Sequence, residues 1–325
     1  MTREGAPQAR WHAPKLHSAG AAPTHAPTLN PTEPPAQRPG QLLLLPSDAG
    51  QLALRVSGQG EPLLLIHSIN AAPSTAEVAP LHRHYERSRR VYSLDLPGFG
   101  ASERSPRAYT PRLMTDALHA AVQAIRRDSG PAPIDALAVS LSCEFLARAA
   151  LERPGDYRSL ALVSPTGFNG RAVRRGPPGS TLAVPWLQRL LQRPGWGRRL
   201  FSGLTRPGVI RFFLRKTWGS RQIDEWLWSQ AVQTVRAPGA EHAPLAFICG
   251  ALFSRDIHDV YDQLRLPVWM CHGTRGDFTD YRQKRRLEGQ PNWTFSVMAT
   301  GALPHFEQLD RFCAEHEAFM RRRAP

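Results

Sequence analysis

With 325 residues, of which 42% are hydrophobic, the chain is long enough to bury a sizeable core. Its formal net charge is +14, and arginine supplies most of the positive charge, since only three of the 41 basic residues are lysines. An arginine excess of this kind is also typical of GC-rich genomes, so it does not by itself indicate nucleic-acid binding. No run of 18 apolar residues occurs, and we therefore expect no membrane-spanning helix.

The four cysteines are far apart in the sequence and have apolar neighbours. This pattern favours reduced, buried thiols over a disulfide framework or a zinc site. The first twenty residues lack the apolar core of a secretory signal peptide, so a cytoplasmic protein is predicted. No metal and no organic cofactor is implied.

Composition divides the chain into four segments. Residues 1–40 are rich in Pro, Ala, His and Thr without periodicity, which predicts a disordered tail. Residues 41–168 alternate between strand and helix patterns. Residues 169–245 are helical or irregular, basic and rich in tryptophan, and the alternation resumes over 246–325. Such alternation favours a mostly parallel sheet covered by helices on both faces, with one large helical insertion.

Individual elements follow from local patterns. Residues 41–68 predict two or three short strands, and 89–100 another strand that ends in a loop. Residues 110–128 predict a helix, because Thr110 can cap it and Pro111 suits its first turn.

Later elements include a buried strand over residues 158–168. Two further strand patterns follow at 266–273 and 292–299, before a final amphipathic helix.

Three stretches carry candidate chemistry in this order. "LLLIHSIN", residues 63–70, is a buried strand that ends in a histidine. "DLPGFGAS", residues 95–102, is a tight glycine-containing loop that lacks the third glycine of a dinucleotide site. "IDALAVSLSCEFLARAA", residues 134–150, is a strand, a turn of small residues and a helix. A sharp strand-to-helix turn needs small residues two before and two after its tip. Ala138 and Ser142 meet that need around Ser140.

From about Gln41 to the C-terminus the chain resembles the α/β-hydrolase fold superfamily, with the insertion in the place of its cap. The resemblance implies that Ser140 is the nucleophile, His305 in "TGALPHFEQLD" the general base, and an acid near "HGTRGDFTD" its partner. Asp277 is the preferred acid and Asp280 the alternative.

The same resemblance implies an oxyanion hole made by the backbone N–H groups of Ile69 and Leu141. His67, Ser68 and Asn70, beside Ile69, become candidate substrate contacts. The alternative for His67 is structural packing.

The inserted segment holds five of the eight tryptophans, and between Thr166 and Ala240 it carries a net charge of +11. The simplest interpretation is a cap whose aromatic side chains pack inward while its arginines are solvated. A second is contact with an anionic membrane surface or an anionic substrate, which would make the protein peripheral at the membrane. No nucleic-acid-binding module is recognisable, so no nucleic acid partner is expected.

The sequence therefore predicts a serine hydrolase that forms an acyl-enzyme, an esterase or lipase-like enzyme acting on a small hydrophobic ester. Two alternatives stay open. The same residues could cleave a carbon–carbon or amide bond, or the domain could be a non-catalytic hydrolase-like protein that binds through its basic cap.

Overall fold

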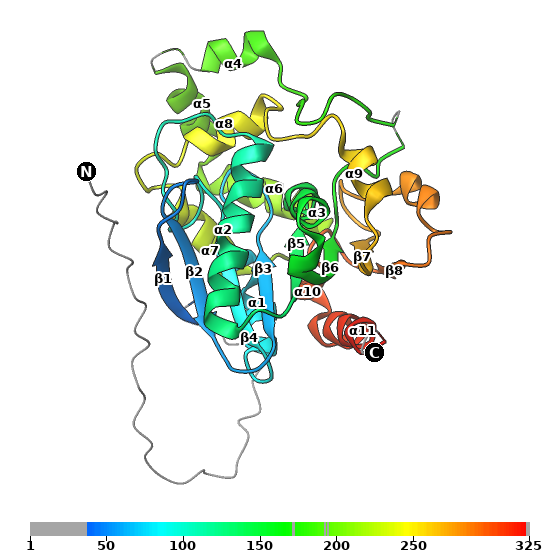
Figure 1. Cartoon of the computed structure of the whole chain (residues 1–325). Helices are drawn as coiled ribbons and strands as arrows, with labels where there is room; N and C mark the ends of the chain where they lie inside the picture. The colour runs from blue at the N-terminus through cyan, green and yellow to red at the C-terminus, as the bar shows by residue number, and fades with distance from the viewer. Residues whose placement is uncertain (1–37, 171–172, 192, 194, 323–325) are drawn as a thin grey trace, which may run out of the picture. The chain divides into compact units, whose positions relative to one another are not determined.

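The computed structural model describes residues 38–170, 173–191, 193 and 195–322 (Figure 1). The predicted disordered tail, residues 1–40, lies almost entirely outside the described residues. The described chain contains an eight-stranded sheet with the order β1-β2-β4-β3-β5-β6-β7-β8. The strands are β1 (Gln41–Leu45), β2 (Leu52–Ser57), β3 (Pro62–Ile66), β4 (Arg90–Asp95), β5 (Ile134–Val139), β6 (Tyr157–Val163), β7 (Val268–Gly273) and β8 (Trp293–Met298). β1 pairs antiparallel with β2, and β2 with β4, whereas β4, β3 and β5 to β8 form a parallel series.

Helices cover both faces of this sheet (Figure 1), as the alternating pattern predicted. α2 (Pro111–Ser129), α3 (Ser142–Glu152) and α9 (Ile257–Gln263) pack on one face, and α1 (Ala79–Tyr85) and α11 (Leu309–Arg321) on the other.

Successive strand residues point to opposite faces, so the central strands feed two separate apolar clusters. In β3, Leu64 and Ile66 join the α2–α3 side, while Leu63 and Leu65 join the α1–α11 side. Burial on both faces explains why these strands read as continuous apolar runs.

The α2 boundaries show how local sequence sets an element. The Thr110 hydroxyl accepts a hydrogen bond of 3.2 Å from the N–H of Leu113, which satisfies one of the free donors of the first turn. Pro111 takes the first helical position, where no N–H is needed. The helix ends at Gly130, whose φ of +99° suits glycine.

Between β6 and α9 the described chain forms α4 (Pro185–Leu191), α5 (Trp196–Leu204), α6 (Pro207–Trp218), α7 (Glu225–Thr234) and α8 (His242–Ile248). Short helices η1 (Thr75–Val78), η2 (Pro154–Asp156), η3 (Arg282–Arg286) and α10 (Pro304–Glu307) complete the list. All four cysteines are buried and unpaired. In the described segments, no helix combines the length and apolarity needed to cross a membrane.

Candidate active site

Ser140 lies at the tip of the turn that joins β5 to α3. Its φ is +57°, in the left-handed region that residues other than glycine, asparagine and aspartate seldom adopt. Its N–H donates a 2.8 Å hydrogen bond to the carbonyl of Val163 on β6, and its carbonyl accepts from Cys143 in the first turn of α3. These contacts from two elements hold a serine in a conformation that costs of order 1–3 kcal/mol.

The neighbours of the turn are small, and one of them has a structural hydrogen bond. Ala138 is fully buried beneath the turn. The Ser142 hydroxyl donates a 2.6 Å hydrogen bond to the carbonyl of His67, at the end of the adjacent strand β3. The hydroxyl two residues after Ser140 is therefore engaged with the protein.

The loop after β3 is organised by a carboxylate that the sequence did not single out. Glu77, in η1, accepts hydrogen bonds of 2.8 Å from the N–H of Ser68 and from the side-chain amide of Asn70. The Asn70 side-chain carbonyl in turn accepts from the N–H of Ala72. Ile69 lies buried inside this network. Glu77 thus fixes the backbone next to the predicted oxyanion donor.

The backbone N–H groups of Leu141 and Ile69 are the predicted oxyanion donors. Leu141 precedes the first residue of α3, where N–H groups carry partial positive charge. Within the described chain, neither the Leu141 N–H nor the Ile69 N–H donates a hydrogen bond. Free amide donors are what the predicted oxyanion hole would require at these two positions.

His67 uses both ring nitrogens inside the protein. Its Nε2 accepts a 3.0 Å hydrogen bond from the N–H of Leu96, and its Nδ1 donates to the carbonyl of Ser68 at 2.6 Å. The ring is fully buried and packs edge-on against Phe99. Both ring nitrogens are thus engaged within the protein, and a contact of His67 with substrate stays a prediction.

The imidazole of His305 hydrogen-bonds to the backbone of η1. The ring is fully buried, on α10, with its Nε2 donating a 2.7 Å hydrogen bond to the carbonyl of Glu77. Its Nδ1 has no hydrogen-bond partner in the described chain. Burial lowers the pKa of His305 to about 4, so the ring is neutral near pH 7.

Both candidate acids also have other partners. Asp277 is half-exposed and lies 3.6 Å from the ammonium of Lys216. Asp280 pairs with the guanidinium of Arg282 and accepts from the N–H of Gly170, and these contacts hold the pKa of its carboxyl well below its usual range. Among the described residues, the hydrogen bonds do not connect Ser140, His305 and either carboxylate.

A different residue of the loop after β8 reaches the strand ends beside Ser140. Ser164, which follows β6 and has a φ of +48°, donates a 2.8 Å hydrogen bond from its hydroxyl to the carbonyl of Ala302. Burial raises the pKa of Tyr281, whose hydroxyl lies near Ser164, well above its usual value. Alanine provides no group that could take a proton. Nothing in the sequence alone marked Ser164, Tyr281 or Ala302.

Comparison with known proteins gives the family. A family model described as "Alpha/beta hydrolase family" matches residues 63–315, more than three quarters of the chain. The chain belongs to the alpha/beta hydrolase family. No curated protein sequence matches it significantly.

Solved structures share the fold of this alpha/beta hydrolase at low identity. One is a serine hydrolase involved in carbazole degradation, with a TM-score of 0.69 and 12% identity over 86% of this chain and 98% of its own. The esterase EaEST from Exiguobacterium antarcticum has a TM-score of 0.67 and 15% identity over 86% of this chain and 98% of its own. The enol-lactonase from Burkholderia xenovorans LB400 has a TM-score of 0.66 and 15% identity over 86% of this chain and all of its own.

Helix α6 of this alpha/beta hydrolase, in the segment predicted to form a cap, contacts the two loops predicted to carry its acid and base. The carbonyl of Lys216 accepts a 3.2 Å hydrogen bond from the N–H of Asp277, and that of Thr217 accepts a 2.9 Å bond from Ala302. A Cβ added at Gly301 would lie 2.5 Å from the Thr217 carbonyl oxygen. Helix α6 and both loops therefore form one tightly packed junction.

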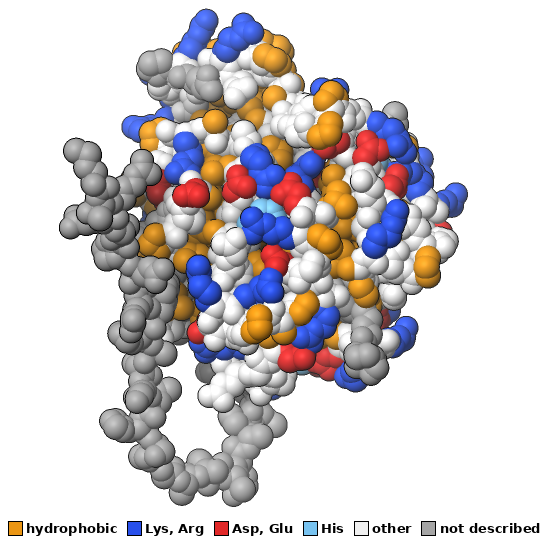
Figure 2. All heavy atoms as spheres, in the orientation of Figure 1, with side chains coloured by type: hydrophobic (Ala, Val, Ile, Leu, Met, Phe, Trp, Pro, Cys, Tyr) orange, Lys and Arg blue, Asp and Glu red, His pale blue; other side chains and the backbone are white. Residues whose placement is uncertain are grey.

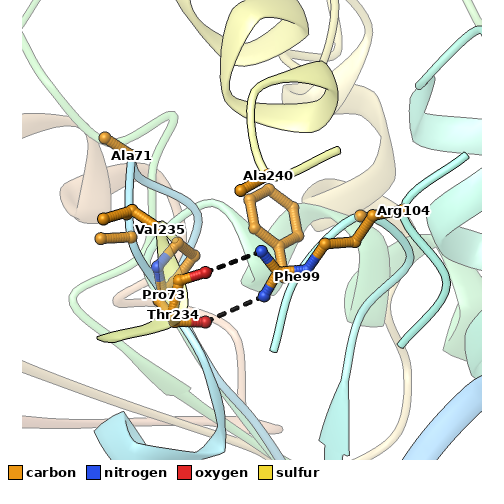
Figure 3. Close-up of a pocket in the computed structure, with 9 residues that line it drawn as sticks. Ala71, Pro73, Phe99, Arg104, Thr234, Val235 and Ala240 are labelled. Carbon is orange, nitrogen blue, oxygen red and sulfur yellow. Dashed lines mark hydrogen bonds between the residues drawn. The ribbon is translucent and has the colours of Figure 1, made fainter. Parts of the chain in front are cut away.

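A contact of Arg104 with α7 closes the space next to the loop after β3 (Figure 3). The Arg104 guanidinium donates to the carbonyl and the hydroxyl of Thr234 on α7, at 2.8 and 2.9 Å, and also to the carbonyl of Gly100. The cavity between them, lined also by Phe99 and Ala240, measures about 10 Å³, which is room for about one water.

A larger cavity of this alpha/beta hydrolase lies among the helices between β6 and α9. It measures about 550 Å³ and lies among α4, α5, α8 and the loop before α2, with Leu191, Leu245 and Tyr109 in its lining. This volume is in the range of small-molecule sites. Ser140, His305 and Asp277 do not line it.

Proposed function

We propose that this alpha/beta hydrolase is a serine hydrolase that forms an acyl-enzyme on Ser140 and cleaves an ester with an apolar acyl or alkyl part. The observation that carries the proposal is the positive φ of Ser140 at the strand-to-helix turn. Glycine would adopt this conformation without strain, so a serine held there suggests a function for its hydroxyl.

In this mechanism the Ser140 oxygen attacks the ester carbonyl, and the N–H groups of Ile69 and Leu141 stabilise the oxyanion. The alcohol leaves, and water then hydrolyses the acyl-enzyme. His305 is the proposed base and Asp277 its partner, as in other triads.

This assignment requires a rearrangement. The Nε2 of His305 must leave the Glu77 carbonyl before it can accept the Ser140 proton. The cap contributes to the present arrangement, because α6 binds both the Asp277 loop and the Ala302 loop through backbone hydrogen bonds. We therefore place cap displacement before the chemical step.

A second candidate is a non-catalytic hydrolase-like binding protein. The observation that favours it is the position of Ala302, which reaches the strand ends beside Ser140 without offering a base. An unactivated serine hydroxyl is a poor nucleophile. Cleavage of a carbon–carbon or amide bond would use the same residues as the ester reaction, and only a substrate panel separates these activities.

Labelling with a fluorophosphonate probe tests the proposal. Purified wild-type protein, Ser140→Ala, Ser142→Ala and His305→Ala are compared after circular dichroism has shown that each is folded. The proposal expects labelling of wild-type and Ser142→Ala, none of Ser140→Ala, and at least about a hundredfold slower labelling of His305→Ala.

Folded wild-type protein that resists the probe would support the binding candidate. Labelling that persists in Ser140→Ala would place the nucleophile elsewhere. A series of p-nitrophenyl esters of increasing acyl length then defines the substrate class.

A further inference from the structure

We propose that the outer surface of cap helices α4, α5 and α6 docks onto an anionic lipid surface. The docking surface comprises the exposed aromatic side chains Trp186, Trp196, Phe212 and Phe213 together with the exposed arginines Arg189, Arg199, Arg206 and Arg215. Docking goes beyond the proposed hydrolysis, because it concerns a surface other than the Ser140 site and does not depend on turnover.

The aromatic side chains of these helices divide into an inward and an outward set. Phe201 and Trp218 are buried at 5% and 4% exposure and pack under the cap. Trp186 and Trp196 are 66% and 56% exposed, and Phe212 and Phe213 are 53% and 51% exposed. Inward packing therefore explains only part of the aromatic content. Large apolar side chains left outward on adjacent helices indicate an interaction site when they lie together.

The three helices contact one another in sequence order, since α4 packs on α5 and α5 on α6. The rings of Phe212 and Phe213 lie edge-to-face, with centroids 5.5 Å apart. Figure 2 shows hydrophobic side chains next to Lys and Arg side chains over α4, at the top of the view. Apolar and cationic groups are thus interspersed on this part of the cap.

The charge of the segment is entirely positive. Residues 184–220 contain eight basic residues and no acidic residue. Arg189, Arg199, Arg206 and Arg215 make no ion pair with any described residue. Elsewhere in the described chain many arginines pair with carboxylates, as in Arg148 with Asp256. In the segment itself Arg198, Arg211 and Lys216 pair with carboxylates outside it, so the uncompensated positive charge is that of the four arginines of the docking surface.

This combination fits a lipid surface better than a nucleic acid. Tryptophan and phenylalanine beside arginine are the side chains that enter the headgroup region of a bilayer, and each basic residue gains from the negative potential of anionic lipids. Single-stranded nucleic acid would instead require a basic groove with stacking platforms along it. The two cavities described above lie next to Thr234 at the end of α7 and among α4, α5 and α8, away from the exposed aromatic side chains of the docking surface.

Vesicle flotation tests the proposal on the full chain. The vesicles are pure phosphatidylcholine or phosphatidylcholine with a minority of phosphatidylglycerol, at low and at high salt. We expect binding to the anionic vesicles at low salt and much less in high salt, which screens exposed charges. Ser140→Ala should bind like the wild type, which separates docking from the proposed hydrolysis.

Two surface variants and two matched controls locate the contact. Arg199→Glu with Arg206→Glu should weaken partitioning by about thirtyfold or more, and Phe212→Ser with Phe213→Ser by at least about tenfold. The controls are Arg127→Glu on α2 and Leu44→Ser on β1, where Leu44 is 45% exposed. Both controls should bind like the wild type.

Absence of binding to anionic vesicles at low salt overturns the proposal, as does equal loss in the controls. Binding of a labelled single-stranded oligonucleotide, with no vesicle binding and with loss in Arg199→Glu/Arg206→Glu, would assign the surface to nucleic acid instead.

Discussion

The hydroxyl of Ser164 donates a 2.8 Å hydrogen bond to the carbonyl of Ala302. Ser164 follows the β6 residue Val163, whose own carbonyl accepts from the N–H of Ser140. Through this chain of contacts the loop after β8 meets the strand ends at Ala302, whereas His305 is directed to Glu77. The proposed chemistry therefore depends on which residue of this loop faces Ser140.

Ala302→His should place an imidazole at the loop position that contacts β6. General-base assistance contributes typically ~10²–10⁴-fold, so in the His305→Ala background, which lacks the proposed base, the added imidazole should accelerate fluorophosphonate labelling by about a hundredfold or more. Ala302→Asn is the matched control, because it adds a polar side chain without a base. An equal acceleration in Ala302→Asn, or none in Ala302→His, would contradict the prediction.

His305 should make stability fall in mild acid. Its folded pKa of about 4 lies below the unfolded value of about 6.5, so its contribution is present above pH 6.5 and is lost as the pH falls towards 4. The linkage predicts a loss of about 2 kcal/mol in the free energy of unfolding between pH 7 and pH 5. Urea titrations of His305→Gln, whose amide can still donate to Glu77, should lack this part of the pH dependence.

His82 gives the comparison for that measurement. It is also fully buried, and burial lowers its pKa to about 4, but its ring hydrogen-bonds to Ser57 on β2 and Ser93 on β4. His82→Gln should remove a second, independent part of the acid dependence. If neither variant changes the pH profile, burial of these rings is not its source.

Glu144 should act in the opposite direction. Burial raises the pKa of this carboxyl to about 7, although Thr166 and the N–H of Ser254 donate to it. The folded state then holds the proton more tightly, so stability is lost as the pH rises from about 4.5 to 7. Relative to the wild type, Glu144→Gln should gain more free energy of unfolding at pH 8 than at pH 5, by up to about 3 kcal/mol. If the variant and the wild type differ in stability by the same amount at pH 5 and pH 8, the raised pKa of Glu144 is not the source of the pH dependence.

Gly301→Ala should loosen the junction between α6 and the loop after β8. Its Cβ would lie within 2.5 to 2.6 Å of backbone atoms of Thr217 and Trp218, which cannot move like a flexible side chain. Such overpacking typically costs ~1–3 kcal/mol. Hydrogen exchange over α6 should quicken, while Gly289→Ala, which meets no atom within 4 Å, should leave it unchanged.

Local pattern predicted much of the fold and part of the site. Continuous apolar runs identified the parallel strands, and Thr110 with Pro111 identified the start of α2, because these signals act through neighbouring residues. Contacts such as that of Glu77 with Ser68 were not predictable, since residues nine apart in an irregular loop follow no periodicity. The division of the chain into core and cap segments stays a prediction.

Sequence by itself determined the turn at Ser140, because a sharp strand-to-helix connection demands small flanking residues and Ala138 and Ser142 supply them. Only the tertiary structure decided where His305 and Asp277 lie. The side chain of His305 is fixed by burial against α11 and by the Glu77 carbonyl, more than two hundred residues away. Asp277 is held by Lys216 at the C-terminal end of α6. Such positions depend on the packing of distant elements, which the spacing of residues along the chain does not encode.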